Sequence, residues 1–318
     1  ADTPRGPRLA SRAPRSTSAD RSDAGHTPCR AAVSSTRHFT RSLRRACVKT
    51  RRAPLIARCL QVLSVVIATI LPHSVALAET TSEQEVVNYD YRVVSKIRFD
   101  RENFTQGLEI HDGRLYVSSG LYGRSMIRVY TFPSLELIQS VPVDPRIFAE
   151  GLTIVNNRLM LLSWRERVML VYALPELTLI GRSGLPGQGW GATHSGSVLW
   201  MSDGSDQLYS ADRDGGGELA TLPVTLAGEP LRNLNELEWV DGEIWANVWQ
   251  TDQIARIDPT NGQVVGMINL AGLLPEEDRL RDTDVLNGIA MNPEDGGIWV
   301  TGKRWPWLYE IKLDKNAR

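Results

Sequence analysis

The residues of this chain that are best suited to chemistry occupy two positions that recur five times between Arg101 and Leu313. The first position precedes a short pair such as Gly-Leu and is occupied by Gln106, Glu150, Trp190, Asn235 and Asn287. The second lies 13 residues beyond the first member of that pair, or 15 in the last copy, and is occupied by Gly120, Trp164, Gly204, Trp249 and Lys303. A lone carboxyl beside an ammonium is suited to moving a proton and stabilising negative charge, and indoles are suited to holding a cationic group.

Several other kinds of catalytic site are excluded by missing residue types. The three cysteines, Cys29, Cys47 and Cys59, precede residue 79, and only His111 and His194 follow it. The chain after residue 79 therefore has no thiol nucleophile and no cluster of His and Cys for a zinc site. A Ser-His-Asp triad would have to use His194, with no nucleophile-elbow motif nearby. We therefore expect neither a metal nor a cofactor.

The spacing of the five copies indicates which elements position these residues. Successive copies start 44, 40, 45 and 52 residues apart, the period of a four-stranded propeller blade. Segments such as Met126–Phe132 alternate like strands, and turns such as Asp241-Gly join them. The sequence therefore predicts an all-β fold, a five-bladed β-propeller. The two recurring positions should meet at one mouth of the ring, because strand starts and ends lie side by side in antiparallel hairpins.

Two further predictions concern packing and ring closure. A set of large apolar residues recurs inside the copies and is assigned to packing between blades: Tyr116, Met160, Trp200, Trp245 and Trp299. The last copy has room for only three strands before the chain ends. Because an open sheet edge is unfavourable, the strand-like segment Tyr91–Phe99 is predicted to supply the fourth strand and close the last blade.

The composition changes near residue 79. Residues 1–78 hold 14 Lys and Arg against 3 Asp and Glu, whereas the rest holds 22 against 34. We interpret residues 1–50 as a basic leader that is either disordered or untranslated. Residues 51–78 are interpreted as a signal peptide cleaved near Ala78 and Glu79, and residues 79–318 as the catalytic domain. Pro72 and His73 argue against the alternative of a membrane anchor, and Arg51-Arg52 leaves the twin-arginine export route open.

Motifs around the recurring positions resemble those of a known family. They include Phe104-Thr-Gln-Gly-Leu, Phe148-Ala-Glu-Gly-Leu, Leu234-Asn-Glu-Leu-Glu, Trp245-Ala-Asn-Val-Trp and Val300-Thr-Gly-Lys-Arg-Trp. Over about residues 95–313 the chain resembles the plant and bacterial type of glutaminyl-peptide cyclotransferase. The resemblance implies a five-bladed propeller that converts the N-terminal glutamine of a peptide into pyroglutamate and releases ammonia, without a metal.

The resemblance also implies roles for single residues. Glu150 matches the catalytic acid/base, although the family's usual Phe-Gly-Glu-Gly reads Phe148-Ala-Glu-Gly here, a change of one methyl group that we expect to be tolerated. The remaining pocket residues, by their motifs, are Phe104, Gln106, Phe148, Trp164, Trp190, Asn235, Trp249 and Lys303. Lys303 is assigned to stabilising the oxyanion, and Asn287 joins the substrate-binding set through its repeat position.

The expected partners are peptides or proteins with an N-terminal glutamine. No nucleic acid and no stable membrane anchor are expected, and the protein should act as a monomer in the periplasm or outside the cell. Two alternatives stay open. One is a secreted propeller that only binds a peptide or small ligand at its Trp-lined mouth. The other is a calcium-dependent lactonase of the six-bladed type, against which five repeats argue.

Overall fold

The computed structural model describes residues 85–315, and the regular secondary structure of this part of the chain is almost entirely β-strand. Its one helix is the 3-10 turn Glu276–Asp278. The all-β prediction is confirmed. The predicted leader and signal peptide lie outside the described residues.

Three four-stranded antiparallel sheets follow one another along the chain. The first contains β2 (Thr105–His111), β3 (Arg114–Ser119), β4 (Met126–Thr131) and β5 (Leu137–Pro142). The second contains β6 (Ala149–Val155), β7 (Arg158–Ser163), β8 (Val168–Ala173) and β9 (Thr178–Gly184). The third contains β10 (Ala192–His194), β11 (Val198–Ser202), β12 (Gln207–Asp212) and β13 (Ala220–Pro223), and a small hairpin follows it, β14 (Thr225–Leu226) and β15 (Glu229–Pro230).

The remaining strands form one eight-stranded sheet. Its first half is β16 (Leu234–Val240), β17 (Glu243–Val248), β18 (Gln253–Ile257) and β19 (Val264–Asn269). Its second half is β20 (Leu286–Met291), β21 (Ile298–Gly302), β22 (Trp307–Lys315) and the N-terminal β1 (Val87–Arg98). β1 joins the halves, because it pairs with β22 on one side and with β19 on the other.

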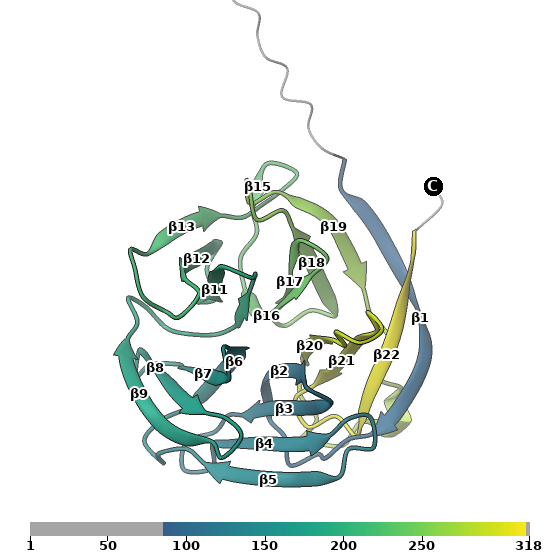
Figure 1. Ribbon diagram of the computed structural model, residues 1–318. Helices are drawn as coiled ribbons and strands as arrows, with labels where there is room; N and C mark the ends of the chain where they lie inside the picture. Colours follow the sequence, from purple (N-terminus) through teal and green to yellow (C-terminus); the bar gives the residue numbers. More distant parts are fainter. Residues whose placement is uncertain (1–84, 316–318) are drawn as a thin grey trace, which may run out of the picture. The chain divides into compact units, whose positions relative to one another are not determined.

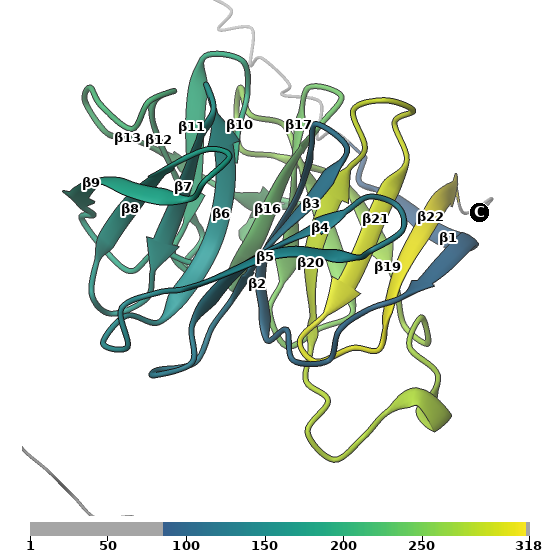
Figure 2. The same cartoon turned by 60° about the horizontal axis from the view of Figure 1, so that its bottom comes forward.

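The strand predicted over Tyr91–Phe99 corresponds to β1, which starts earlier, at Val87, and ends at Arg98. Its antiparallel pairing with β22 runs from Tyr89 opposite Lys315 to Arg98 opposite Trp307, and Figure 2 shows the two strands side by side. The parallel contact with β19, around Val87 and Gly266, was not predicted. Both edges of β1 therefore contribute to the sheet.

Tight turns close the hairpins that position the inner strands. Asp112 and Gly113 have φ values of 48° and 65°, and Asp241 and Gly242 have values of 48° and 90°. Positive φ at both central residues is the geometry of the two-residue turns whose twist matches paired strands, and Asp-Gly is a favoured sequence for it. These turns place the recurring positions of each hairpin at its opposite end.

The first strands of the successive sheets contact one another in a cyclic order. β2 contacts β6, β6 contacts β10, β10 contacts β16, β16 contacts β20, and β20 contacts β2 again. Figure 1 shows β2, β6, β16 and β20 near the middle of the view, with β5, β9, β13 and β19 on the outside. The starts of the inner strands are thereby brought together.

The predicted packing residues are all buried: Tyr116, Met160, Trp200, Trp245 and Trp299. Tyr116 of β3 shares a hydrophobic cluster with β6–β8, and Met160 of β7 shares one with β10–β12. Trp200 of β11 packs with β16–β18, Trp245 of β17 with β20–β22, and Trp299 of β21 with β2–β4. Each member therefore connects its own group of strands to the next group, and the last connects back to the first.

The inner strands approach too closely for a side chain at the glycine that follows the first recurring position. A Cβ added to Gly191 would lie 2.0 Å from the carbonyl oxygen of Asn235, and one added to Gly151 would lie 2.6 Å from the Cα of Gly191. The fourth copy has Glu236 at this place. Its carboxylate accepts hydrogen bonds from the backbone N–H of Ile289 (2.8 Å) and of Leu108 (3.3 Å), so a side chain of β16 reaches both β20 and β2.

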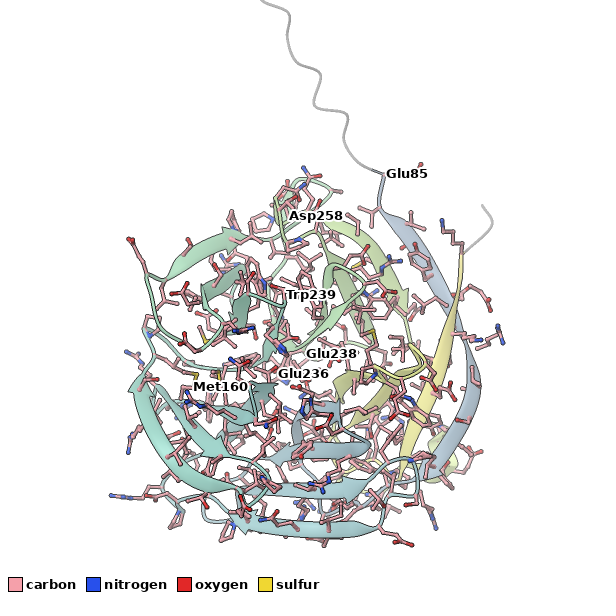
Figure 3. The ribbon with its side chains drawn as sticks, viewed as in Figure 1. Glu85, Met160, Glu236, Glu238, Trp239 and Asp258 are labelled. Carbon is pink, nitrogen blue, oxygen red and sulfur yellow. The ribbon has the colours of Figure 1, made fainter. Side chains whose placement is uncertain are left out.

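Two more buried glutamates connect neighbouring inner strands. Glu238 of β16 accepts a hydrogen bond from the N–H of Met291 (2.7 Å), and Glu109 of β2 accepts one from the N–H of Ile154 (2.9 Å). Figure 3 shows Glu236 and Glu238 near the centre of the view. Burial raises the pKa of Glu109 to about 8 and raises the pKa values of Glu236 and Glu238 well above the usual range. These carboxyls satisfy backbone donors on the inner strands that the sheets leave unpaired.

Candidate active site

All but one of the predicted site residues line a single pocket at the starts of the inner strands. The pocket has a volume of about 450 Å³. The predicted residues in its wall are Phe104, Gln106, Phe148, Glu150, Trp164, Trp190, Asn235, Trp249 and Lys303. We call it the aromatic pocket.

Irregularities in the inner strands aim several of these side chains. The pairing register shifts between Thr105 and Gly107 in β2 and between Ala149 and Leu152 in β6. It also shifts between Leu234 and Leu237 in β16, which contains Asn235. A bulge leaves a residue outside the ladder and turns its side chain away from the regular pleat. Gln106, Glu150 and Asn235 all lie within such interruptions.

Glu150 and Lys303 form the electrostatic centre of the pocket. Glu150 is only 5% exposed, and burial raises the pKa of its carboxyl well above the usual range, although the charge of Lys303 acts in the opposite direction. Lys303 is 6% exposed, and burial lowers the pKa of its ammonium while Glu150 and Asp284 oppose that change. Desolvation thus shifts the pKa of the Glu150 carboxyl upward and the pKa of the Lys303 ammonium downward. Both shifts are toward the neutral range, in which a proton-transfer group works best.

The aromatic side chains contact one another edge to face. Phe104 and Phe148 have ring centroids 6.5 Å apart, Phe148 and Trp164 have centroids 5.5 Å apart, and Trp190 and Trp249 have centroids 5.4 Å apart. The Nζ of Lys303 lies 5.2 Å from the centroid of the Phe104 ring. This wall is apolar, yet its ring faces can attract a cation.

Gln188 is hydrogen-bonded to two indoles of this wall. Its Oε1 accepts hydrogen bonds from the Nε1 of Trp164 (2.6 Å) and from the Nε1 of Trp190 (3.0 Å). One side chain therefore links two rings from neighbouring sheets, because Trp164 follows β7 and Trp190 precedes β10. Sequence reasoning missed Gln188, because it lies in a loop that has no fixed position in the repeat.

The structure places Asn287 behind the pocket rather than in its wall. Asn287 is fully buried (0% exposed), and its Nδ2 donates to the carbonyl oxygens of Thr105 (3.1 Å) and Gln106 (3.4 Å). The same Nδ2 lies 3.5 Å from the Oε1 of Gln106. Asn287 was predicted to bind substrate; the structure places it outside the wall of the aromatic pocket, in contact with the lining residue Gln106.

Four lining residues were not predicted: Leu121, Gln250, Asp284 and Val285. Leu121 and Gln250 directly follow the second recurring position and have positive φ values of 93° and 67°. Extending the repeat comparison by one residue would have found them. Asp284 and Val285 come from the long connection between β19 and β20, which has no counterpart in the other copies.

Three comparisons with known proteins identify the family of this chain. The family model described as glutamine cyclotransferase matches residues 65–313. The chain is 37% identical over 235 residues to a glutaminyl-peptide cyclotransferase of Arabidopsis thaliana, covering 72% of each chain. The crystal structure of Myxococcus xanthus glutaminyl cyclase superposes with a TM-score of 0.68 at 31% identity, covering 73% of this chain and 100% of that one. With a matching family model, sequence relative and solved structure, the chain belongs to the glutamine cyclotransferase family.

Proposed function

We propose that this chain is a glutaminyl-peptide cyclotransferase that acts on peptides and proteins with an N-terminal glutamine. In this reaction the α-amine nitrogen forms a bond to the side-chain carbonyl carbon. The bond from that carbon to the amide nitrogen breaks, and ammonia leaves with the proton that the amine loses. The observation that carries the proposal is the buried Glu150, with its raised pKa, facing Lys303 in an aromatic pocket.

Glu150 acts as the general acid/base. The α-amino group of a peptide has a pKa of about 8, so an appreciable fraction is neutral and nucleophilic at neutral pH. The harder step is expulsion of an amide nitrogen. A carboxyl with a raised pKa accepts the proton of the attacking amine and delivers it to that nitrogen. No nucleophilic side chain of the enzyme takes part.

The other pocket residues orient the substrate and stabilise charge. Lys303 stabilises the oxyanion that develops on the carboxamide, and Gln106 and Asn235 hold the carboxamide in the folded-back conformation that cyclisation requires. The indoles of Trp164, Trp190 and Trp249 surround the glutamine side chain and its amine. Phe104 and Phe148 keep water away from Glu150, and Asn287 supports Gln106 from behind.

The framework of the site is a five-bladed propeller whose last blade is β20, β21, β22 and β1. Three observations support it. The inner strands contact one another in cyclic order. The large packing residue of each group of strands reaches the next group, and Trp299 reaches the first. β1 supplies a fourth strand beside β22, and its contact with β19 explains why the last two blades share one hydrogen-bonded sheet.

In this proposal the protein is exported from the cytoplasm before it acts. Residues 1–50 form a leader, residues 51–78 a signal peptide and residues 79–318 the catalytic domain, which works as a monomer in the periplasm or outside the cell. The basic composition before residue 79 and the small residues before Glu79 support this division. In the part of the chain that the structure covers, no helix is long and apolar enough to cross a membrane. Cleavage near Ala78 would leave no stable anchor.

Ammonia release tests the function directly. Purified protein incubated with Gln-Ala should release ammonia and form a pyroglutamyl peptide, whereas Asn-Ala, whose ring would be smaller, should release far less. A protein that binds Gln-Ala without releasing ammonia would instead be a non-catalytic binding propeller.

The pH dependence of catalysis should report the charge of Lys303. On the acidic side, kcat/KM should rise with pH as Glu150 ionises. The ammonium of Lys303 lowers the pKa of Glu150 against the larger effect of burial, so Lys303→Met should move this limb to higher pH. Lys303→Arg keeps the charge and should leave the limb near its original position. A limb that stays in place in Lys303→Met would contradict the coupling of the two groups.

Activity should survive chelators. The chain after residue 79 holds only His111 and His194 and no cysteine, so a zinc-dependent mechanism has too few ligands of the usual kind. Turnover of Gln-Ala should be unchanged by EDTA or phenanthroline. Loss of turnover without unfolding, followed by recovery with zinc, would show that the metal-free mechanism is incorrect.

A further inference from the structure

A second hollow adjoins the aromatic pocket and shares part of its wall. It has a volume of about 310 Å³, within the range of small-ligand sites. Gln250, Asp284 and Val285 line both spaces, and Asp252 and Arg279 line only the second. We call the second space the outer hollow. The two spaces are therefore neighbours that share the border formed by these three residues.

A peptide substrate needs such a space. Only its first residue cyclises, so the amine and carboxamide lie at Glu150 while the rest of the chain must leave the aromatic pocket. An extended chain advances about 3.3–3.6 Å per residue, so the second and third residues lie within about 7 Å of the first. A chain that leaves past Gln250 and Val285 therefore places these residues in the outer hollow.

The charged groups of the outer hollow are predominantly acidic. Asp252 and Asp284 contribute two carboxylates, and Arg279 contributes one guanidinium. The Nε of Arg279 lies 3.5 Å from the Oε1 of Glu276, which offsets its positive charge. The pKa of Tyr91 is raised, first by burial and second by the negative charge of Asp252. The electrostatic field of Asp252 therefore reaches Tyr91.

We propose that the outer hollow binds the second and third residues of the substrate and favours a basic side chain there through Asp252 and Asp284. The inference rests on the proposed function, because it takes the substrate to be a peptide with an N-terminal glutamine. It adds a preference that the aromatic pocket, which holds only the glutamine, does not supply. Exposed ion pairs contribute little individually, so the preference is about threefold to fivefold.

Kinetics with matched peptides test the preference. The peptides are Gln-Lys-Ala-amide, Gln-Ala-Lys-amide, Gln-Ala-Ala-amide and Gln-Glu-Ala-amide, whose amidated ends remove the C-terminal carboxylate. At low salt, kcat/KM should be about threefold to fivefold higher for at least one lysine peptide than for Gln-Ala-Ala-amide, and lowest for Gln-Glu-Ala-amide. The difference should shrink as KCl is added, since salt screens exposed charges.

Substitutions at Asp252 test whether this carboxylate causes the preference for a lysine side chain. Asp252→Asn should reduce the lysine preference, measured as the ratio of kcat/KM for Gln-Lys-Ala-amide to kcat/KM for Gln-Ala-Ala-amide, because it removes one of the two carboxylates of the outer hollow. Asp252→Lys should reverse the order, so that Gln-Glu-Ala-amide becomes better than Gln-Lys-Ala-amide. The matched control is Asp241→Asn, an exposed carboxylate in the hairpin turn between β16 and β17, where asparagine tolerates the φ of 48°. That control should behave like the wild type.

Direct binding separates this inference from the proposed function. Calorimetry of the same peptides with Glu150→Gln, in which turnover should be about 100-fold slower or more, reports binding in the outer hollow separately from catalysis. Equal Kd values for the lysine, alanine and glutamate peptides, or a preference that survives Asp252→Lys, would overturn the inference even if ammonia is released. Selective binding by a protein that releases no ammonia from any peptide would overturn the proposed function and support the outer hollow.

Discussion

Glu150→Gln should lower kcat for Gln-Ala by about 100-fold or more, as loss of a general acid/base does. Glutamine has nearly the same size and fits the same buried place, but it can neither accept the proton of the attacking amine nor deliver it to the leaving nitrogen. Because burial holds the pKa of Glu150 high, the wild-type carboxyl is poised for both steps. Steady-state ammonia release measures the loss of kcat. The thermal unfolding midpoint measures the stability of the variant, and it should not fall.

The matched control for this prediction is Glu166→Gln. Glu166 lies at the edge of the site, where its carboxylate accepts hydrogen bonds from the Tyr122 hydroxyl (2.8 Å) and the backbone N–H of Phe148 (3.2 Å). Its charge raises the pKa of Glu150 only as a minor cause, after burial. Glu166→Gln should therefore keep kcat within about threefold of the wild type. Activity of Glu150→Gln in that same range would rule out Glu150 as the acid/base.

The repeat made most of the lining of the aromatic pocket predictable from the sequence. Residues at fixed offsets within the copies, such as Glu150, Trp249 and Lys303, meet because antiparallel hairpins bring those offsets together. The motifs around them identified the family, which the comparisons confirm. Gln188 and Asp284 belong to loops of unequal length, and no repeat rule fixes where such loops turn.

Asn287 shows the limit of the repeat rule within the hairpins themselves. Its offset in the repeat is the same as that of Gln106. Its side-chain amide, however, donates hydrogen bonds to the nearby carbonyl oxygens of Thr105 and Gln106. A buried amide is stabilised by such partners and stays behind the pocket. Offset alone specifies which strand end a residue occupies, whereas the nearest backbone acceptors decide where its side chain points.

The presence of the strands and hairpins was predictable from the sequence, but some of the contacts between the strands were not. Alternating apolar residues and Asp-Gly turns indicated the hairpins, and the large residues assigned to packing are buried as expected. The glutamates at Glu109, Glu236 and Glu238 had no predicted role, because their partners are backbone N–H groups of neighbouring inner strands. Acidic residues inside apolar strands were the available signal, since burying a carboxyl without a partner is costly.

Removing β1 should destabilise the protein by several kcal/mol, a large share of the roughly 5–15 kcal/mol that holds a typical domain together. The loss has two parts. The edges of β22 and β19 would lose their hydrogen-bonded partner, and the buried Tyr89, which packs with Tyr309 and Ile311, would be lost from the hydrophobic cluster. Unpaired backbone groups at an apolar edge also favour aggregation.

Two chains that begin at Glu79 and at Arg101 make this comparison, with thermal unfolding as the measurement. The longer chain retains β1 and should unfold at a clearly higher temperature, and Tyr89→Ala in that chain should fall between the two because it removes the ring but keeps the strand. The aromatic pocket lies on other strands, so any shorter chain that still folds should bind peptide through the same residues. Equal midpoints for the two chains would mean that β20–β22 hold together without β1, and the proposed closure of the last blade would be incorrect.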